Sequence, residues 1–208
     1  MTQKIVSPDR IAGVVFAGGR SRRFEGGEKE NAVFGDRPLI DHVIERAAPQ
    51  VRTLAIGRAR GARGNLRGAE IIADEFENCG PIAGLSAGLK WAGALTPPVE
   101  FLATFACDTP RFPVDIVRRL SEPVAAGRAR AAIAATGGAL HPTFGLWAVS
   151  FVDEIDAAIG RGEFSLKGLA KAVGAANVDF GAALQGAFFN INRREDLELL
   201  ERSGDKNN

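Results

Sequence analysis

The feature that most constrains the fold is an uninterrupted apolar run at residues 11–17, which is followed at once by glycines and charged residues. A short apolar run without polar alternation is typical of a strand that is buried on both faces. Such strands occur in parallel sheets, because crossover helices cover both faces of the sheet. We therefore expect an α/β fold in which this run is a central strand.

The rest of the chain alternates between strand-like and helical patterns. Further strands are expected at residues 51–56, 70–73 and 100–106, and helices at 38–47, 81–95 and 113–126, with a loop or a short irregular helix at 58–68. The less regular second half predicts strands at 129–135 and 187–191, contains another apolar run at 141–149, and predicts helices at 150–159, 166–173 and 193–202. This alternation predicts a three-layer, doubly wound, mostly parallel α/β sheet. Without a repeat or linker, we expect one domain over residues 1–208, with flexible ends at 1–10 and 203–208.

Composition narrows the classes of function. The 208 residues are 46% hydrophobic, which is enough for a full core, and the formal net charge is +1. The net charge therefore creates no strong electrostatic attraction to a nucleic acid or an anionic membrane. Cys79 and Cys107 form no metal-binding pattern, and we interpret them as reduced thiols of a cytoplasmic protein. The polar N-terminus does not resemble a signal peptide, and no apolar run is long enough to span a membrane.

Ligands of open α/β sheets bind beyond the carboxyl ends of the strands, so the segment after the first strand is a candidate site. This segment, residues 17–29, contains neither of the two common glycine-rich phosphate motifs. Its glycines let backbone N–H groups face an anion, and its arginines match phosphate oxygens in pairs. The cations are Arg20, Arg22, Arg23 and Lys29. The segment predicts a polyphosphate site; the alternative is a solvated turn with exposed arginines.

Two carboxylates follow later strands. Asp108 comes directly after the fourth expected strand, where it can hold Mg²⁺ against a triphosphate, since Mg²⁺ needs only one or two protein carboxylates. The alternative is that Asp108 caps the helix that begins near Pro113. Asp74 follows the third strand and precedes Gly80-Pro81. A carboxylate there can accept hydrogen bonds from guanine N1–H and the exocyclic amine, or from a sugar hydroxyl. The alternative is that the segment is a plain loop followed by the start of a helix, with no ligand.

Together these segments resemble the nucleotidyltransferases, and among them the molybdenum cofactor guanylyltransferases. Their signature is a Gly-Gly turn, then Ser-x-Arg and a Lys a few residues later, which resembles Gly18-Gly19, Ser21-Arg22-Arg23 and Lys29. Asp74 with Gly80-Pro81, Cys107-Asp108-Thr109-Pro110, His141-Pro142 and Asn190-Ile191-Asn192 follow in the family's order. The departures are Glu28 where the family usually has Asp, Phe24 where it often has Met, and Gly57 where it often has Asn.

The resemblance implies a Rossmann-like sheet of the nucleotide-diphospho-sugar transferase type. It also implies transfer of GMP from GTP to molybdopterin or its molybdenum-loaded form, release of pyrophosphate, and Mg²⁺ as cofactor. The implied catalytic residues are Arg22, Lys29 and Asp108, and Asp108 is also the implied metal ligand. The implied nucleotide contacts are Ala17, Gly18, Gly19, Arg20, Ser21, Arg23, Lys29, Asp74, Gly80, Asp108 and Asn190. Proteins that deliver or accept the pterin are possible partners.

Several interpretations stay open at this point. Asn190 is a candidate for a substrate phosphate or the metal shell, Asn192 for a helix cap, and His141 for a packed structural residue. Arg161 and Lys167 lie where a pterin could bind, but nothing local separates them from surface charges. Alternative functions are a cytidylyl- or sugar-phosphate nucleotidyltransferase, and a non-catalytic nucleotide-binding regulator.

Overall fold

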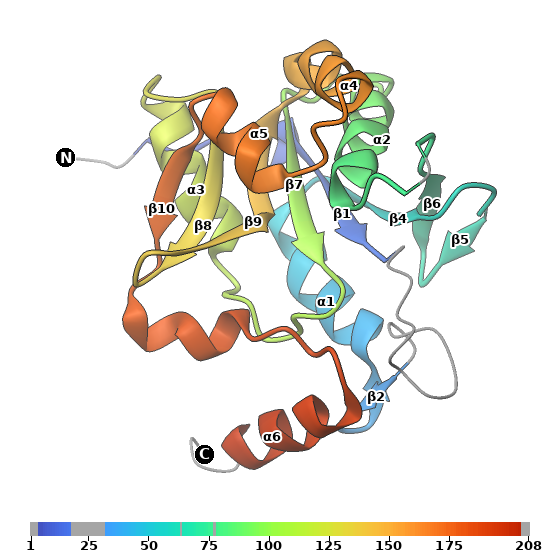
Figure 1. Cartoon of the computed structure of the whole chain (residues 1–208), viewed down its shortest axis with the longest axis vertical. Coiled ribbons are helices and arrows are strands. Elements are labelled where there is room, and N and C mark those ends of the chain that lie inside the picture. The colour runs from blue at the N-terminus through green and yellow to red at the C-terminus, as the bar shows by residue number, and fades with distance from the viewer. Residues whose placement is uncertain (1–3, 18–31, 63, 77, 205–208) are drawn as a thin grey trace.

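A mixed, mostly parallel sheet forms the centre of the molecule. The computed structural model describes residues 4–17, 32–62, 64–76 and 78–204 (Figure 1). Within these residues the main sheet has eight strands in the order β10-β8-β9-β7-β1-β4-β6-β5. They are β1 (Ile11–Phe16), β4 (Thr53–Arg58), β5 (Asn65–Leu66), β6 (Ala69–Ala73), β7 (Phe101–Ala106), β8 (Ala131–Thr136), β9 (Ala139–Ala148) and β10 (Ala176–Asp179). Only β5 and β9 run antiparallel to their neighbours.

The first strand lies where its composition predicts. β1 pairs in parallel with β4 on one side and β7 on the other. Ile11, Ala12, Val14 and Val15 are almost completely buried, because helices cover both faces of the sheet at this point. The expectation of a central, doubly covered strand is therefore confirmed.

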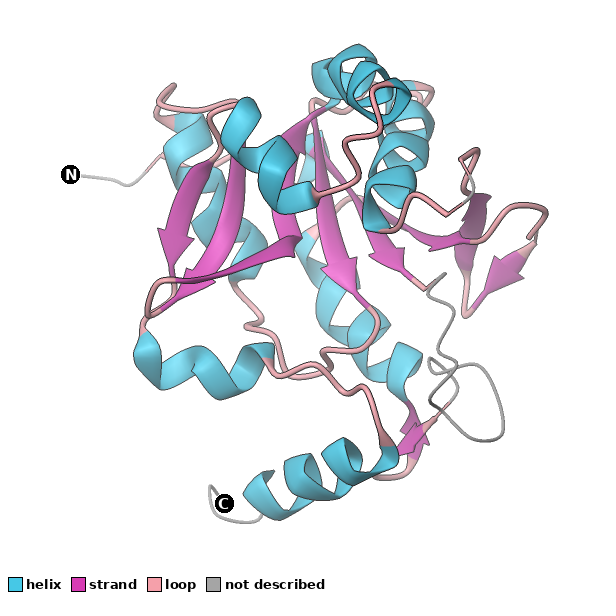
Figure 2. Ribbon diagram, in the orientation of Figure 1, coloured by secondary structure: helices cyan, strands magenta, loops and turns pink. Residues whose placement is uncertain are grey.

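Helices cover the sheet on both faces (Figure 2). One apolar core lies between the sheet and the helices α1 (Leu39–Ala47) and α3 (Ile116–Ala125). A second core lies on the opposite face, under α2 (Pro81–Gly93), α4 (Val152–Gly160) and α5 (Leu166–Ala172). The short 3-10 helices are η1 (Pro8–Arg10), η3 (Ala48–Gln50), η4 (Val149–Phe151) and η5 (Ala182–Phe188). Among the described residues no helix has the length and apolar character needed to cross a bilayer.

Helix α2 packs unusually close to the sheet because two of its glycines face strands. A Cβ atom at Gly84 would lie 2.9 Å from Cδ1 of Phe16, at the end of β1. A Cβ atom at Gly88 would lie 2.8 Å from Cδ2 of Leu102 on β7. Contacts this short leave no room for a side chain, so the two glycines set the distance between α2 and the strands that lead to the carboxyl edge.

The end of the chain packs against a segment near its beginning. The helix α6 (Arg194–Gly204) lies beside a small hairpin formed by β2 (Val33–Phe34) and β3 (Arg37–Pro38) (Figure 1). A third apolar cluster joins these parts of the chain, and it consists of Phe34, Leu39, Ile191, Leu197 and Leu200.

The second half differs from the sequence-based expectation in two places. Residues 187–191 do not form a strand, because η5 ends at Phe188 and irregular backbone follows. The apolar character of this segment comes from Phe188, whose ring contacts the rings of His141, Phe144 and Phe180. The edge strand β10 was not expected, and its residues alternate between half-buried and exposed with few apolar side chains. In the first half, residues 58–68, expected as a loop or a short irregular helix, contribute the two-residue strand β5.

Candidate nucleotide site

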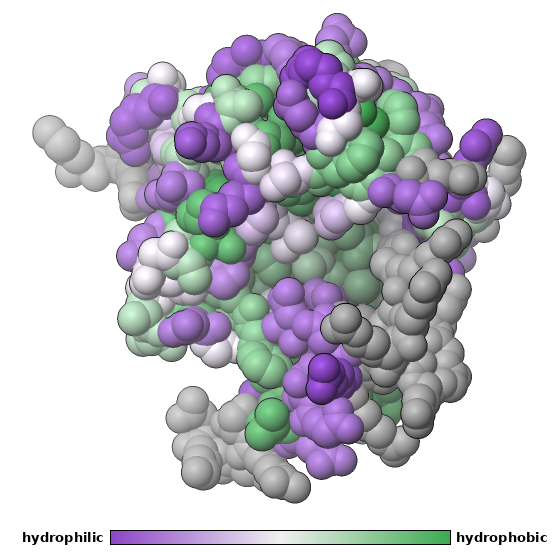
Figure 3. All heavy atoms as spheres, in the orientation of Figure 1, coloured by the Kyte–Doolittle hydropathy of each residue, from purple (hydrophilic) through white to green (hydrophobic). Residues whose placement is uncertain are grey.

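The parallel strands β1, β4, β6 and β7 end at one edge of the sheet, and the first residues beyond them are joined by backbone hydrogen bonds. The Ala17 N–H donates to the Gly57 carbonyl at 2.8 Å, and the Cys107 N–H donates to the Phe16 carbonyl at 3.2 Å. On the other side, the Asp74 N–H donates to the Arg58 carbonyl at 2.8 Å. Figure 3 shows the molecule hollowed where the strands end, with apolar surface at the bottom of the hollow.

Asp108 lies at this edge beside a segment that is distant in sequence. The Ile191 N–H donates to the Asp108 carbonyl at 2.8 Å. The buried Thr109 hydroxyl lies 3.2 Å from Oδ1 of Asp108 and 2.6 Å from Oδ1 of Asn190. The structure therefore brings together two of the residues that the sequence singled out. Helix α3 begins at Ile116 with Asp115 in the N-cap position, so Asp108 does not cap it.

The oxygen atoms gathered around Thr109 fit the ligand preference of Mg²⁺. The carboxylate of Asp108 and the amide oxygen of Asn190 are hard donors, and Asp108 is half-buried rather than sealed in the core. In the described part of the chain, no group of three or more His, Cys, Asp or Glu side chains is arranged to hold a metal. Mg²⁺ keeps several waters and takes one or two protein carboxylates, so Asp108 with its neighbour suits it.

Asp74 presents an unsatisfied carboxylate oxygen. Its Oδ1 is buried and has no hydrogen-bond partner among the described residues. Burial raises the pKa of Asp74 to about 6. A Cβ atom placed on Gly84 would lie 3.6 Å from this oxygen, so the bare backbone of α2 forms one wall beside it. A buried acceptor without a donor costs free energy, which a ligand with N–H or O–H groups can recover.

Gly80 turns the chain from the Asp74 loop into α2. Its φ of 68° and ψ of −155° lie in a region that only glycine adopts without strain. Pro81 then occupies the first turn of the helix, where its missing N–H is not needed. Gly80 is exposed at the loop, as a nucleotide contact requires.

The glycine-rich segment that the sequence analysis emphasised lies outside the described residues. This applies to Gly18, Gly19, Arg20, Ser21, Arg22, Arg23 and Lys29. Its attachment point is described, because Ala17 directly follows β1 and is buried. The Cys107 N–H donates a hydrogen bond to the carbonyl of Phe16, so Ala17 lies beside the end of β7, which Asp108 follows.

The remaining candidates lie at or near the same edge with different surroundings. His141 Nε2 lies 2.7 Å from the Thr136 hydroxyl, and its ring stacks on Phe188 at 4.5 Å. Burial lowers the pKa of His141, so it is a packed neutral residue at pH 7.

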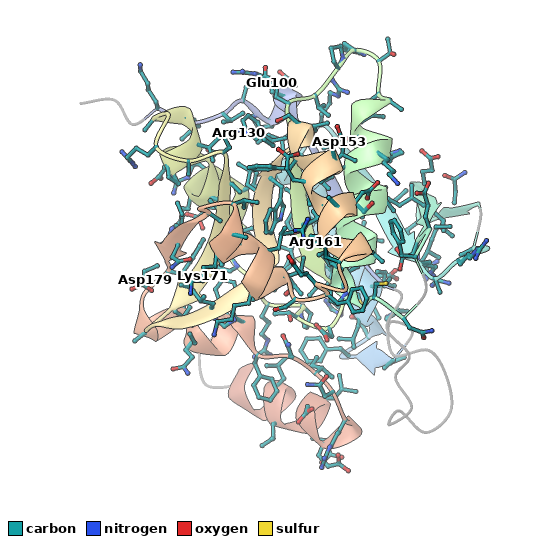
Figure 4. The ribbon with its side chains drawn as sticks, turned by 45° about the horizontal axis from the view of Figure 1, so that its top comes forward. Glu100, Arg130, Asp153, Arg161, Lys171 and Asp179 are labelled. Atoms are coloured by element: carbon teal, nitrogen blue, oxygen red, sulfur yellow. The ribbon has the colours of Figure 1, made fainter. Side chains whose placement is uncertain are left out.

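Two basic candidates lie on the helices that cover the sheet. Arg161, at the end of α4, pairs with Glu163 at 2.8 Å (Figure 4), and Lys167 is exposed on α5. The carboxylate of Asp196 accepts hydrogen bonds from the N–H groups of Asn192 and Arg193, just before α6. The capping role expected of the Asn192 side chain stays a prediction.

Sequence reasoning missed two residues near Asp108. Thr109 joins Asp108 to Asn190, and Arg111 places its guanidinium 5.3 Å from the centre of the Phe34 ring. In the sequence, only their position just beyond a buried strand pointed to these two residues, because the residues that they contact lie far away along the chain. The long-range contacts therefore became visible only in the fold.

Comparison with known proteins shows the family to which the chain belongs. Residues 13–177 match the family model described as "MobA-like NTP transferase domain". A molybdenum cofactor guanylyltransferase of Cereibacter sphaeroides is 39% identical, over 92% of this chain and 96% of its own length. Another, from Rhizobium leguminosarum, is 35% identical and covers 97% of both chains.

Solved structures share the architecture. Molybdopterin-guanine dinucleotide biosynthesis protein A of Archaeoglobus fulgidus superimposes with a TM-score of 0.70 at 24% identity, over 94% of this chain and 99% of that one. A 2-C-methyl-D-erythritol 4-phosphate cytidylyltransferase of Thermus thermophilus gives a TM-score of 0.64 at 17% identity, over 97% and 99%. These similarities confirm the expected fold of the nucleotide-diphospho-sugar transferase type. By its sequence, the chain belongs to the MobA-like NTP transferase family and is a nucleotidyltransferase akin to the molybdenum cofactor guanylyltransferases.

Proposed function

We propose that this protein transfers GMP from GTP to the terminal phosphate of molybdopterin, or of its molybdenum-loaded form, and releases pyrophosphate. The observation that carries the proposal is the pair of carboxylates that flank the end of β1 in a chain of this family. Asp108 lies on the β7 side, and Asp74, with its unsatisfied oxygen, lies beyond β4 on the β6 side.

In the proposed reaction, an oxygen of the acceptor phosphate forms a bond to the α-phosphorus of GTP. The bond from that phosphorus to the oxygen bridging to the β-phosphate breaks, and pyrophosphate leaves with the electron pair. The nucleophile is already an anion, so no strong general base is required. Catalysis then rests on positioning the two phosphates and on neutralising their charge.

The negative charge of the GTP phosphates would be neutralised by groups on both sides of the end of β1. Arg22 and Lys29, with Arg20 and Arg23, are proposed to hold the β- and γ-phosphates, with Ala17, Gly18, Gly19 and Ser21 forming the turn around them. Asp108, with Asn190 beside it, would hold Mg²⁺, whose charge stabilises the phosphate oxygens when it is bound. This division of roles follows the family resemblance and the positions of Asp108 and Asn190.

The guanine base is proposed to lie against Asp74. Guanine offers N1–H and an exocyclic amine side by side, so one carboxylate can accept from both and its buried oxygen gains the donor that it lacks. A ribose hydroxyl is the other donor that Asp74 could meet. Gly80 and the start of α2 would form the wall beside this contact.

The proposal also treats residues 1–208 as one catalytic domain that acts in the cytoplasm, where GTP is available. Proteins that deliver molybdopterin or accept the finished dinucleotide are expected partners.

The direct test is pyrophosphate release from GTP and molybdopterin in the presence of Mg²⁺. Asp108→Ala should keep the fold and lower kcat by about a hundredfold or more, because charge neutralisation at the phosphates is lost. Asp153→Ala is the matched control, since this exposed aspartate begins α4 at the opposite edge of the sheet and should leave activity unchanged (Figure 4). Full activity of Asp108→Ala would refute the assignment, and faster turnover with CTP than with GTP would favour the cytidylyltransferase alternative.

A further inference from the structure

Lys90 is the centre of a polar cluster that joins separate elements. Its ammonium group on α2 pairs with Glu75, in the loop after β6, and lies 2.9 Å from Oδ2 of Asp156 on α4. The same Nζ lies 5.4 Å from the centre of the Phe76 ring. One side chain therefore contacts two successive residues of the loop and a helix from the second half of the chain.

A second hydrogen bond fixes the far side of this cluster. The Ser86 hydroxyl donates to Oδ1 of Asp156 at 2.5 Å, while Oδ2 of the same carboxylate faces Lys90. Ser86 is buried and precedes Lys90 by one helical turn, so the two side chains lie on the same side of α2. Both oxygens of Asp156 are thus occupied, and the ammonium group has a defined position between Asp156 and the loop.

The loop that Lys90 holds begins with the candidate base-binding residue. Asp74 directly precedes Glu75 and Phe76, and the side-chain oxygen Oδ1 of Asp74 has no partner among the described residues that would orient it. On its N-terminal side Asp74 is fixed by the hydrogen bond from its N–H to the Arg58 carbonyl. On its C-terminal side the contacts of Glu75 and Phe76 with Lys90 hold the chain against α2.

The cluster contributes little to overall stability. The side chains of Glu75, Lys90 and Asp156 are 60%, 34% and 32% exposed. Ion pairs at such positions are screened by water and typically stabilise a fold by less than about 1 kcal/mol. These ion pairs instead affect ligand binding at the loop. A loop that is already held in its bound conformation loses less conformational entropy when a ligand binds.

We propose that Lys90 is a positioning residue for the nucleotide base: by holding Glu75 and Phe76 against α2, it keeps the carboxylate of Asp74 oriented for its ligand. This inference rests on the proposed contact between Asp74 and the nucleotide. It assigns no contact between Lys90 itself and GTP.

The test compares Lys90→Met, which keeps a long apolar stem without charge, with Lys90→Arg, which keeps the charge. Calorimetry should show that Lys90→Met weakens guanosine and GTP to the same extent, by roughly tenfold, because the base contact is shared by both ligands. Its kcat at saturating GTP should stay within about twofold of the original, and Lys90→Arg should restore most of the affinity. Lys171→Met, at an exposed lysine of α5, is the control that should change neither quantity (Figure 4).

The pH dependence of guanosine binding separates positioning from a general loss of structure. Guanosine is used because the triphosphate of GTP itself titrates near pH 6. Burial raises the pKa of Asp74 to about 6, so guanosine should bind more tightly as pH rises through that value. In Lys90→Met the loosened loop gives Asp74 more water, its pKa falls, and the rise in affinity should occur at lower pH. Arg58, Glu75 and Lys90 are the charged residues to consider around this loop, and Glu75→Gln should act like Lys90→Met.

The outcomes distinguish the inference from the function on which it rests. If Asp74→Asn binds guanosine as tightly as the original protein, the proposed base contact is wrong. If Asp74→Asn weakens binding but Lys90→Met does not, only the role of Lys90 is refuted. A loss in Lys90→Met for GTP without a loss for guanosine would mean direct attraction of phosphate, which also overturns the positioning role.

Discussion

At the scale of single residues, Asp74 combines a candidate nucleotide-binding position with a cost to the fold. Its pKa of about 6 lies above the ordinary value of 3.8, so the folded protein binds this proton more tightly than the unfolded chain does. The stabilisation from this proton is fully present below about pH 4 and is lost as pH rises through about 6. Above that pH the fold carries a partly buried charge that nothing in the described residues compensates.

Replacing this charge should therefore stabilise the protein. We predict that Asp74→Asn increases the free energy of unfolding at pH 7 by on the order of 1 kcal/mol, a value discounted because water still reaches the carboxylate. The gain should vanish below about pH 4, where Asp74 is protonated in both states. Urea unfolding at the two pH values checks this, and equal stability of both proteins at pH 7 would contradict it.

At the scale of elements, the distance between α2 and β1 determines the shape of the candidate base site. Gly84→Ala would place a methyl group 2.9 Å from the Phe16 ring and 3.6 Å from the Asp74 carboxylate. The helix must then move outward, and overpacking of this kind typically costs about 1–3 kcal/mol. We expect both stability and guanosine affinity to fall.

A glycine on the same helix provides the control for that substitution. A Cβ atom at Gly93 would meet only Cγ1 of Val149, at 3.4 Å, and Gly93 is exposed. Gly93→Ala should be neutral or slightly stabilising, because alanine favours helix by up to about 1 kcal/mol. Thermal unfolding with guanosine titration measures both variants, and similar behaviour of the two would show that the close approach at Gly84 does not matter.

The elements also show where sequence reasoning succeeds. β1 was predictable, because burial on both faces removes the polar alternation that other strands show. The position of Asp74 and Asp108 at one edge of the sheet was predictable, because parallel strands place whatever follows them there; their role in nucleotide binding stays a prediction. β10 was not, because its residues have little strand character and pairing with β8 decides their conformation. The role of Thr109 was hidden because its partner Asn190 comes from a distant segment.

At the scale of the whole molecule, helix α6 packs against the β2–β3 hairpin and the segment around Ile191. Leu197 of α6 is buried against the cluster that contains Phe34 and Ile191. Ile191 directly follows the candidate site residue Asn190 and donates its N–H to the Asp108 carbonyl, so α6 packs beside this part of the candidate site.

This arrangement predicts that a substitution in α6 affects activity from a distance. Leu197→Ala should destabilise the protein by about 2–4 kcal/mol and lower the rate of pyrophosphate release. Leu199→Ala is the matched control, because Leu199 is 58% exposed and its replacement should change stability by no more than about 0.5 kcal/mol. Equal effects of the two substitutions would mean that α6 does not support the site.

The bond between the Ile191 N–H and the Asp108 carbonyl has a consequence for biosynthesis. A nascent chain that has emerged from the ribosome only as far as β10 already contains β7 and Asp108 beyond its end, but not the segment that supplies the Ile191 N–H. Co-translational folding can therefore complete the central strands early, while the nucleotide site is assembled among the final steps. A chain arrested with β10 outside the ribosome and the segment from Asn190 onward still inside it would hold a folded sheet without a finished candidate site.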